Sequence, residues 1–147
     1  MDILIKSFNR PYYLDRCIQS IILNSQNTYY KIVVLDDGTP QKYLDKLQDK
    51  YPKINILKSD LYNEKADAVA NNKSEISSSI PIDLWLNSAK NTSNYFLLIE
   101  DDFWFTKSFN LKKFRLNLET DKIKMLKLFW LGNSKLLSEK IVSNNNL

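Results

Sequence analysis

Two groups of adjacent carboxylates follow apolar segments of the sequence. The apolar run 32–35 leads directly into residues 36–39 (DDGT), and the apolar run 95–99 leads into residues 100–102 (EDD). Adjacent like charges raise each other's pKa unless a cation compensates, and a hard divalent ion with oxygen ligands is such a cation. The second group therefore predicts a Mg2+ or Mn2+ site, and a solvated acidic turn is the alternative.

The first group differs from a phosphatase nucleophile loop at one essential position. Phosphatases of the haloacid-dehalogenase type carry D-x-D-G-T after a strand, and the first aspartate attacks phosphorus. Leu35 holds that position here and offers no nucleophile. A nucleotide-binding turn and a simple polar loop remain as interpretations of residues 36–39.

The composition removes several kinds of chemistry. The chain has 147 residues, of which 44% are hydrophobic, and this is enough for one globular domain with a core. It contains no histidine, one cysteine and two glycines. These counts exclude a histidine-based catalytic pair, the usual zinc sites, an intrachain disulfide and the glycine-rich nucleotide loops. Carboxylates, lysines, hydroxyls and an oxygen-ligated metal remain for catalysis.

Charge and hydropathy indicate the environment of the protein. The net charge is +4, from 21 basic and 17 acidic residues that are interspersed, and this does not favour a nucleic-acid surface. No apolar run approaches the ~20 residues that span a bilayer, and no secretory signal is visible. We therefore expect a cytoplasmic protein without a transmembrane segment.

Strands and helices are expected to alternate along the chain. Short apolar runs predict strands, and apolar stripes at helical spacing predict the helices between them. The expected strands are residues 3–5, 31–35, 54–57, 95–99 and 124–131. The expected helices follow Asn9 and Thr39 and occupy 82–89, 109–118 and 136–142. A long polar loop with room for one short helix is expected at 59–79. This order predicts an α/β fold with a mostly parallel central sheet, in which the continuous apolar strand 95–99 is covered on both faces.

The first expected helix shows the pattern most clearly. Asn9 is a candidate N-cap ahead of Pro11, as Thr39 is ahead of Pro40. Apolar residues then follow at i, i+3, i+4, i+7 and i+8, namely Leu14, Cys17, Ile18, Ile21 and Ile22. On this stripe Cys17 is expected to be a small buried hydrophobic residue.

Polar segments follow three of the expected strands, at residues 6–10, 36–39 and 100–102. In parallel sheets, ligands bind outside the carboxyl ends of the strands. If these strands are neighbours, the three segments line one crevice.

Three stretches, in this order, resemble glycosyltransferases of family 2 and their relatives with the GT-A fold. The stretches are LIKSFNRPYYLDRCIQSI, YKIVVLDDGT and NYFLLIEDDFWF, and the resemblance covers residues 2–60 and 82–106. It implies a single Rossmann-like GT-A domain over residues 1–147, with helices on both faces of the sheet and residues 1–106 as the donor-binding half. The implied ligands are a nucleotide-diphospho-sugar donor, a Mn2+ or Mg2+ ion, and a glycan, lipid or protein acceptor.

The resemblance also assigns roles to individual positions around the nucleotide. Phe8 would lie beside the nucleobase, Asp37 would bind the base or the ribose, and Asp36 would stabilise the turn. The first loop around the nucleotide would contribute Ser7, Asn9 and Arg10.

The second carboxylate group matches the metal motif of the family. Asp102 would bind the metal together with Glu100, and Asp101 would contact the ribose or a metal-bound water.

Two departures from the family pattern bear on function. The A-R-N-like stretch of the family corresponds to residues 86–89 (LNSA), which lack the arginine, so Lys65 or Lys73 would have to contact the diphosphate. GT-A catalytic domains are also generally longer than this chain. Three interpretations stay open: a donor-binding half, a chain truncated in its C-terminal acceptor half, or an unusually compact enzyme.

No residue stands out as the catalytic base, since Glu119, Asp121 and Glu139 are candidates only because they are acidic. A sugar-nucleotide-dependent glycosyltransferase is the first hypothesis, and a non-catalytic nucleotide-binding or interaction domain of the same fold is the second. A nucleotidylyltransferase is excluded because its first loop needs glycines, which residues 7–10 lack.

Overall fold

The computed structural model describes residues 1–26, 29–120 and 125. The chain divides into two compact units, Met1–Asn110 and Leu111–Leu147, which we call unit 1 and unit 2. Unit 1 carries the whole described sheet, and unit 2 carries helix α5 (Leu111–Thr120). The predicted α/β class is confirmed.

Unit 1 is built on a sheet in which every neighbouring pair of strands is parallel. The strands are β1 (Asp2–Ser7), β2 (Ile32–Asp36), β3 (Asn55–Lys58) and β4 (Phe96–Glu100), in the spatial order β3-β2-β1-β4. The register sets Ser7 beside Asp36 and Lys6 beside Glu100. The polar ends of β1, β2 and β4 therefore lie at the same edge of the sheet.

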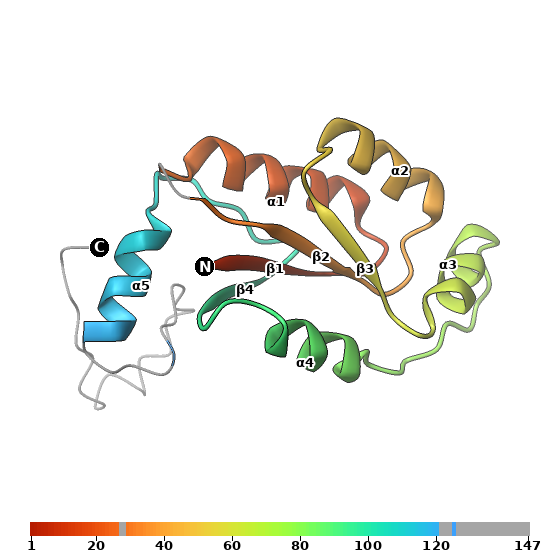
Figure 1. The fold of residues 1–147 in the computed structure, drawn as a ribbon. Coiled ribbons are helices and arrows are strands. Elements are labelled where there is room, and N and C mark those ends of the chain that lie inside the picture. Colours follow the sequence, from red (N-terminus) through yellow and green to blue (C-terminus); the bar gives the residue numbers. More distant parts are fainter. Residues whose placement is uncertain (27–28, 121–124, 126–147) are drawn as a thin grey trace, which may run out of the picture. The chain divides into compact units, whose positions relative to one another are not determined.

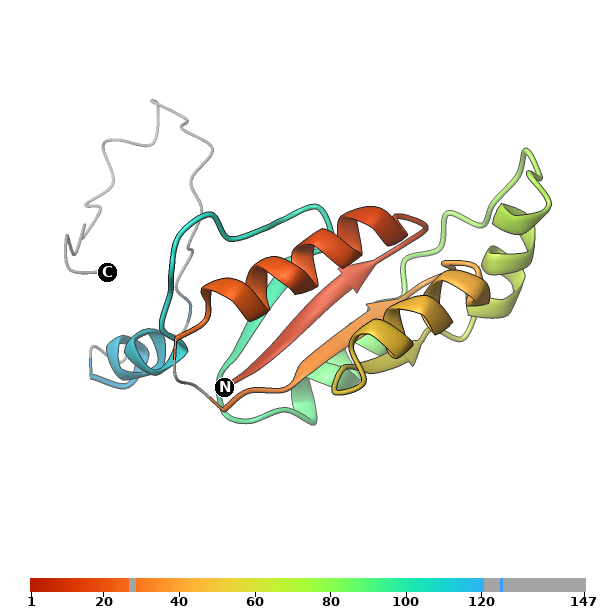
Figure 2. The same ribbon diagram turned by 90° about the horizontal axis from the view of Figure 1, so that it is seen from above.

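Helices cover both faces of this sheet, as predicted. α1 (Pro11–Asn24) and α2 (Gln41–Lys50) lie on one face, and α4 (Ile82–Lys90) lies on the other (Figure 1). α3 (Tyr62–Ala70) lies beyond the carboxyl ends of β2 and β3, as the view from above shows (Figure 2). The chain thus winds from β1 to β3 through helices on one face and returns through α4 to the far side of β1.

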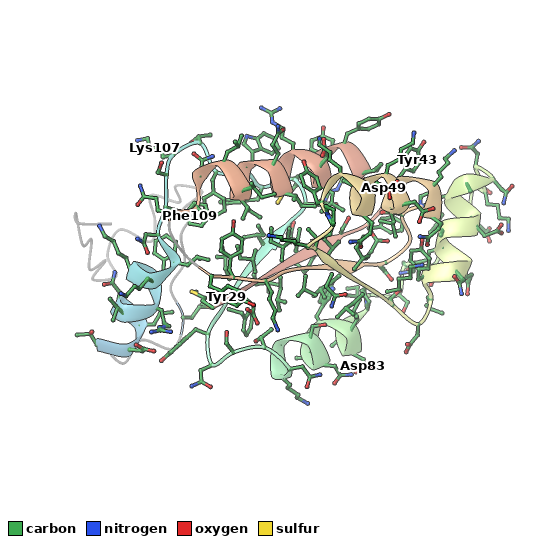
Figure 3. All side chains as sticks on the ribbon, turned by 45° about the horizontal axis from the view of Figure 1, so that its top comes forward. Tyr29, Tyr43, Asp49, Asp83, Lys107 and Phe109 are labelled. Atoms are coloured by element: carbon green, nitrogen blue, oxygen red, sulfur yellow. The ribbon has the colours of Figure 1, made fainter. Side chains whose placement is uncertain are left out.

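The layer between α1 and the sheet is an apolar core, and side chains fill it (Figure 3). Its fully buried members are Leu14, Cys17, Ile18 and Ile21 from α1 and Ile3, Ile5 and Val34 from the strands. Each such aliphatic side chain contributes about 1.5–3 kcal/mol relative to an exposed one. Ile22, the fifth predicted member of the stripe, is 47% exposed, because it lies at the margin of the apolar face of the helix.

The predicted N-caps differ from the observed ones by one residue. Arg10 occupies the N-cap position of α1, and Asn9 instead adopts a left-handed conformation with φ 48°. Pro40 occupies the N-cap position of α2, while the hydroxyl of Thr39 donates to Asp36. Both predicted caps were wrong because their polar groups hold the preceding turns instead of the helix ends.

The expected polar segment 59–79 contains a short helix, α3, which begins soon after β3 ends, and this agrees with the expectation of one short helix there. One further prediction needs correction. β4 was expected in the middle of the sheet but is an edge strand among the described residues, and its Leu98 side chain is 48% exposed. The segments expected at 124–131 and 136–142 lie outside the described residues, apart from Met125.

In the part of the chain that the structure describes, no helix has both the length and the apolar character needed to cross a bilayer.

Candidate functional site

The winding of the sheet creates a switch point between β1 and β4. From β1 the chain proceeds through α1 to β2 on one side, whereas β4, which the chain reaches through α4 on the opposite face of the sheet, lies on the other side of β1 (Figure 1). In open α/β sheets, the crevice outside the carboxyl ends of such strands is the usual ligand site. Residues 8–10 and 100–102 lie at this position.

Hydrogen bonds join the three polar segments directly. The N–H of Asp37 donates to the carbonyl of Ser7 over 3.0 Å, and the N–H of Asn9 donates to Oγ1 of Thr39 over 3.0 Å. On the other side, the N–H of Phe8 donates to Oδ2 of Asp101 over 3.4 Å. The loop after β1 is thus held between the ends of β2 and β4, and the expected convergence on one edge is observed.

Asp36 organises the turn after β2. Its carboxylate is fully buried and accepts hydrogen bonds from the N–H of Gly38 at 3.0 Å and from the N–H and hydroxyl of Thr39, both at 2.7 Å. All of these donors belong to its own loop. Asp36 therefore holds the turn in shape, and its inclusion among the nucleotide-binding residues stays a prediction.

Gly38 allows α3 to approach this turn closely. Its φ of 141° is a conformation that side chains rarely adopt, and an added Cβ would lie 2.6 Å from Cβ of Lys65 and 3.1 Å from the ring of Phe8. Only glycine fits here. The close approach brings Lys65 into the site.

Asp37 and Lys65 form a buried ion pair. The Nζ of Lys65 lies 2.6 Å from Oδ2 of Asp37, and the hydroxyl of Ser59 donates to Oδ1 over 2.5 Å. Lys65 also donates to the carbonyl of Ser79 over 2.5 Å. The lysine side chain is only 3% exposed and the aspartate 11%. One ion pair therefore links the turn after β2, helix α3 and the segment before α4.

This arrangement changes the role expected for Lys65. The sequence suggested a contact to the diphosphate from Lys65 or Lys73, but Lys65 is committed to Asp37. Lys73 forms an exposed ion pair with Asp67. The sequence reasoning missed Ser59 and the pairing of Lys65 with Asp37, and no local pattern indicates either contact.

Glu100 does not join the other two carboxylates. Its side chain pairs with Nζ of Lys6 at 2.7 Å, and Nζ of Lys6 lies 4.8 Å from the ring centroid of Trp85 on α4. Asp101 is buried on the opposite face, near Cys17 of α1. The side chain of Glu100 thus pairs with Lys6 and not with Arg10, and its predicted role as a metal ligand stays a prediction.

Arg10 holds the remaining two carboxylates. Its Nη2 lies 2.5 Å from Oδ1 of Asp101, and its Nη1 donates to Oδ2 of Asp102 over 2.7 Å. Asp101 is fully buried, whereas the side chains of Arg10 and Asp102 are each 43% exposed. Two carboxylates and one guanidinium leave a net charge of −1 at the switch point.

Asp101 is only partly satisfied in this position. Burial raises the pKa of its carboxyl, against the opposing effects of the Arg10 charge and the Phe8 N–H. Its Oδ1 lies in an ion pair with Nη2 of Arg10, and the neighbouring hydroxyl of Ser7 also favours the charged carboxylate, which lowers the pKa. Among the described residues, neither Oδ1 nor the Ser7 hydroxyl makes a hydrogen bond of strict geometry.

The donor set can be compared with the needs of a divalent ion. Among residues 1–26, 29–120 and 125, no group of three carboxylates or thiols gathers as metal ligands. Asp101 and Asp102 nevertheless offer hard oxygen donors beside Arg10, and Mg2+ is often bound by one or two carboxylates with phosphate oxygens completing its shell. These two residues fit a metal that binds together with a diphosphate.

A large cavity adjoins the nucleoside side of the site. It has a volume of about 820 Å³ and lies between the sheet and the segment 79–92, with Leu4, Val33 and Leu57 on the sheet side. Asp37 and Ser59 line the same cavity. The carboxylate of Asp37 can therefore be reached by a ligand although it is mostly buried.

Comparison with known proteins agrees with this architecture. Residues 2–71 match the model of the family described as glycosyl transferase family 2. A search among curated proteins found no match.

Solved structures with the same fold are found at low sequence identity. S. aureus TarS is 16% identical with a TM-score of 0.55, over 82% of this chain and 20% of TarS. S. aureus TarS 1-349 is 15% identical with a TM-score of 0.54, over 88% of this chain and 38% of the other. The galactosyltransferase LgtC, solved with donor and acceptor sugar analogs, gives a TM-score of 0.48 at 19% identity, over 74% of this chain and 40% of LgtC.

Taken with the parallel sheet, the two TarS structures confirm the expected fold. The α/β domain is a GT-A fold like that of family 2 glycosyltransferases. The chain spans 20% and 38% of the lengths of the two TarS chains.

Proposed function

We propose that this protein is the donor-binding part of a glycosyltransferase that takes a sugar from a nucleotide-diphospho-sugar. The observation that carries the proposal is the joining of three polar loops at the switch point of a GT-A sheet. The nucleoside would bind on the Asp37 side and the diphosphate on the Asp102 side.

Asp37 has the capacity to bind the nucleoside while its ion pair stays intact. A carboxylate has about four lone-pair sites, and Ser59 and Lys65 use two of them. The others can accept a hydrogen bond from a base N–H or a ribose hydroxyl. Phe8, 37% exposed beside this turn, offers a flat ring on which a base can stack.

The diphosphate side combines a cation with two acidic side chains. Arg10 has five N–H donors, and two of its nitrogens contact Asp101 and Asp102. A divalent ion held by Asp102 and Asp101 would supply positive charge opposite the diphosphate leaving group. Arg10 would add directed N–H groups on the same side. The acceptor, a glycan, lipid or protein, is left open by the proposal, as is the catalytic base.

The candidates for that base lie mostly outside the described residues. Asp121 and Glu139 are not described. Glu119 is exposed on α5, and its carboxylate lies 3.5 Å from Nε of Arg115, one helical turn away. This contact is an ordinary surface ion pair.

Calorimetric titration with UDP, GDP, ADP and CDP, each with Mn2+ and with a chelator, tests the proposal. At least one nucleoside diphosphate should bind, and Asp37→Asn should weaken it by about 1.5–3 kcal/mol, the usual contribution of a hydrogen bond to a charged group. Asp49→Asn, an exposed aspartate on α2 that does not line the cavity, is the matched control and should not change the affinity.

A second arm separates the transferase from a binding module of the same fold. Incubation with the corresponding nucleotide sugars should release free nucleoside diphosphate, slowly without an acceptor. Tight binding without release under any condition would favour the non-catalytic hypothesis, and no binding of any nucleotide would reject both.

A further inference from the structure

The contacts of Arg10 carry a consequence for how the site binds its metal. The guanidinium covers the same oxygens that a divalent ion would need, with Nη2 2.5 Å from Oδ1 of Asp101 and Nη1 2.7 Å from Oδ2 of Asp102. Each of these oxygens keeps a second lone pair, so the competition is one of charge. The guanidinium lies against the same two carboxylates that a divalent ion would approach, and the two cations repel each other there.

We propose that Arg10 competes with the divalent ion for Asp101 and Asp102. The arginine holds both carboxylates in the free protein, and it moves to the diphosphate when the ion binds. The inference rests on the proposed function in one respect, which is that the ligand contacted by the displaced Arg10 is the diphosphate of the donor. It does not need the identity of the sugar or the nucleotide.

Two observations support an arginine that can move. Its side chain is 43% exposed, so that the guanidinium can turn towards solvent without crossing the core. Its two partners also differ, because Asp102 is 43% exposed while Asp101 is fully buried.

The charges at the site favour the exchange. With Arg10 in place the local charge is −1, which is too little to hold a divalent ion tightly beside a guanidinium of the same sign. With Arg10 displaced the two carboxylates present −2 to the ion. A diphosphate then attracts both cations, so that arginine and metal cease to compete once the donor is bound.

Manganese titration of the protein without nucleotide tests the competition directly. Binding of Mn2+ is followed by the electron paramagnetic resonance signal of the free ion. Arg10→Gln removes the competing charge and should bind Mn2+ about tenfold more tightly than the wild type, within the range of ordinary couplings between sites. Arg10→Lys keeps the charge and should stay near the wild type.

Two control variants locate the effect. Arg16→Gln removes an exposed arginine from the same helix, whose guanidinium lies 4.3 Å from the ring centroid of Trp104, and should leave the Mn2+ affinity unchanged. In Arg10→Gln/Asp102→Asn the gain should disappear, because the ion has lost its exposed ligand. An unchanged or weaker affinity in Arg10→Gln, or a gain that survives in the double variant, would overturn the proposal.

A measurement on the wild type avoids dependence on any variant. Phenylglyoxal modifies accessible arginines, and mass spectrometry gives the rate at each position. Mn2+ should speed the modification of Arg10 and leave Arg16 unchanged. A rate at Arg10 that stays equal or falls would contradict the exchange. Since no nucleotide is present, failure here is distinct from failure of the nucleotide titrations.

Discussion

At the scale of single residues, Gly38 shows how tightly the turn after β2 is built. Gly38→Ala should destabilise unit 1 by about 2–4 kcal/mol, because backbone strain at φ 141° adds to a contact of 2.6 Å with Cβ of Lys65. Urea unfolding measures the loss. Asn72→Ala, at an exposed residue with φ 51°, isolates the strain and should cost about 1 kcal/mol. Equal losses would mean that the crowding by Lys65 is unimportant.

Cys17 is the residue whose ionisation should limit stability in alkali. Burial, followed by the charges of Asp101 and Asp102, raises the pKa of its thiol from 9.0 to about 12. The unfolded chain releases this proton near pH 9 and the folded chain does not. Its contribution to stability is therefore complete below pH 9 and is lost as the pH rises towards 12.

The size of this effect can be measured with one variant. At pH 10 the loss is about 1.4 kcal/mol, the free energy of one pH unit above the unfolded pKa. Urea unfolding between pH 7.5 and 10 should show a smaller decline for Cys17→Ala than for the wild type. Above pH 10, Tyr62 adds to the loss, because burial and then the charges of Asp36 and Asp45 raise its pKa to about 12. Parallel declines up to pH 10 would contradict the assignment to Cys17.

At the scale of elements, Lys65 is the anchor of α3. Lys65→Met leaves Asp37 as a buried, unpaired carboxylate and should cost about 3–5 kcal/mol in unfolding free energy. Lys65→Met/Asp37→Leu should recover much of this loss, because it removes both charges. Lys73→Met breaks an exposed pair of the same helix region and should change little.

Hydrogen exchange can show which part of the structure is destabilised in Lys65→Met. Lys65→Met should speed the exchange of the amides of α3, since the ion pair to the turn after β2 is gone. Unchanged exchange throughout α3 would mean that apolar contacts and not the ion pair hold the helix.

The strands of this protein could be predicted because each is a short apolar run between polar residues, and the parallel order followed from the helices between them. The position of β4 at the edge of the described sheet could not be predicted. Its sequence is as continuously apolar as that of a central strand, although Leu98 is exposed. The pairing of Glu100 with Lys6 could not be predicted either, because their contact depends on the register between β1 and β4. The ion pair of Lys65 could not be predicted from local sequence patterns, because its partner Asp37 lies 28 residues earlier.

The cap errors have a physical reason of the same kind. Propensities place asparagine and threonine at helix starts, but Asn9 and Thr39 are bonded to each other through the N–H of Asn9. That bond joins the ends of β1 and β2 and belongs to the site. Local rules failed where tertiary contacts assemble the functional loops.

At the scale of the molecule, unit 1 contains all strands of the described sheet and the helices on both of its faces. A chain of residues 1–110 should therefore fold cooperatively by itself, because its length lies well above the ~40 residues below which a core needs disulfides or metals. Circular dichroism during thermal unfolding checks this, with the 147-residue chain as the reference. A gradual, non-cooperative melt of the shorter chain would show that its core is incomplete.

The buried thiol of Cys17, the only cysteine in the sequence, can also report local opening of the structure between α1 and the end of β4. Its Sγ lies 3.8 Å from the carbonyl oxygen of Glu100, so a reagent can reach it only when α1 lifts from β4. The rate of thiol modification in the native state then reports the free energy of that local opening. A ligand that binds across Arg10 and Asp102 spans the same two elements, and it should slow the reaction in proportion to its occupancy.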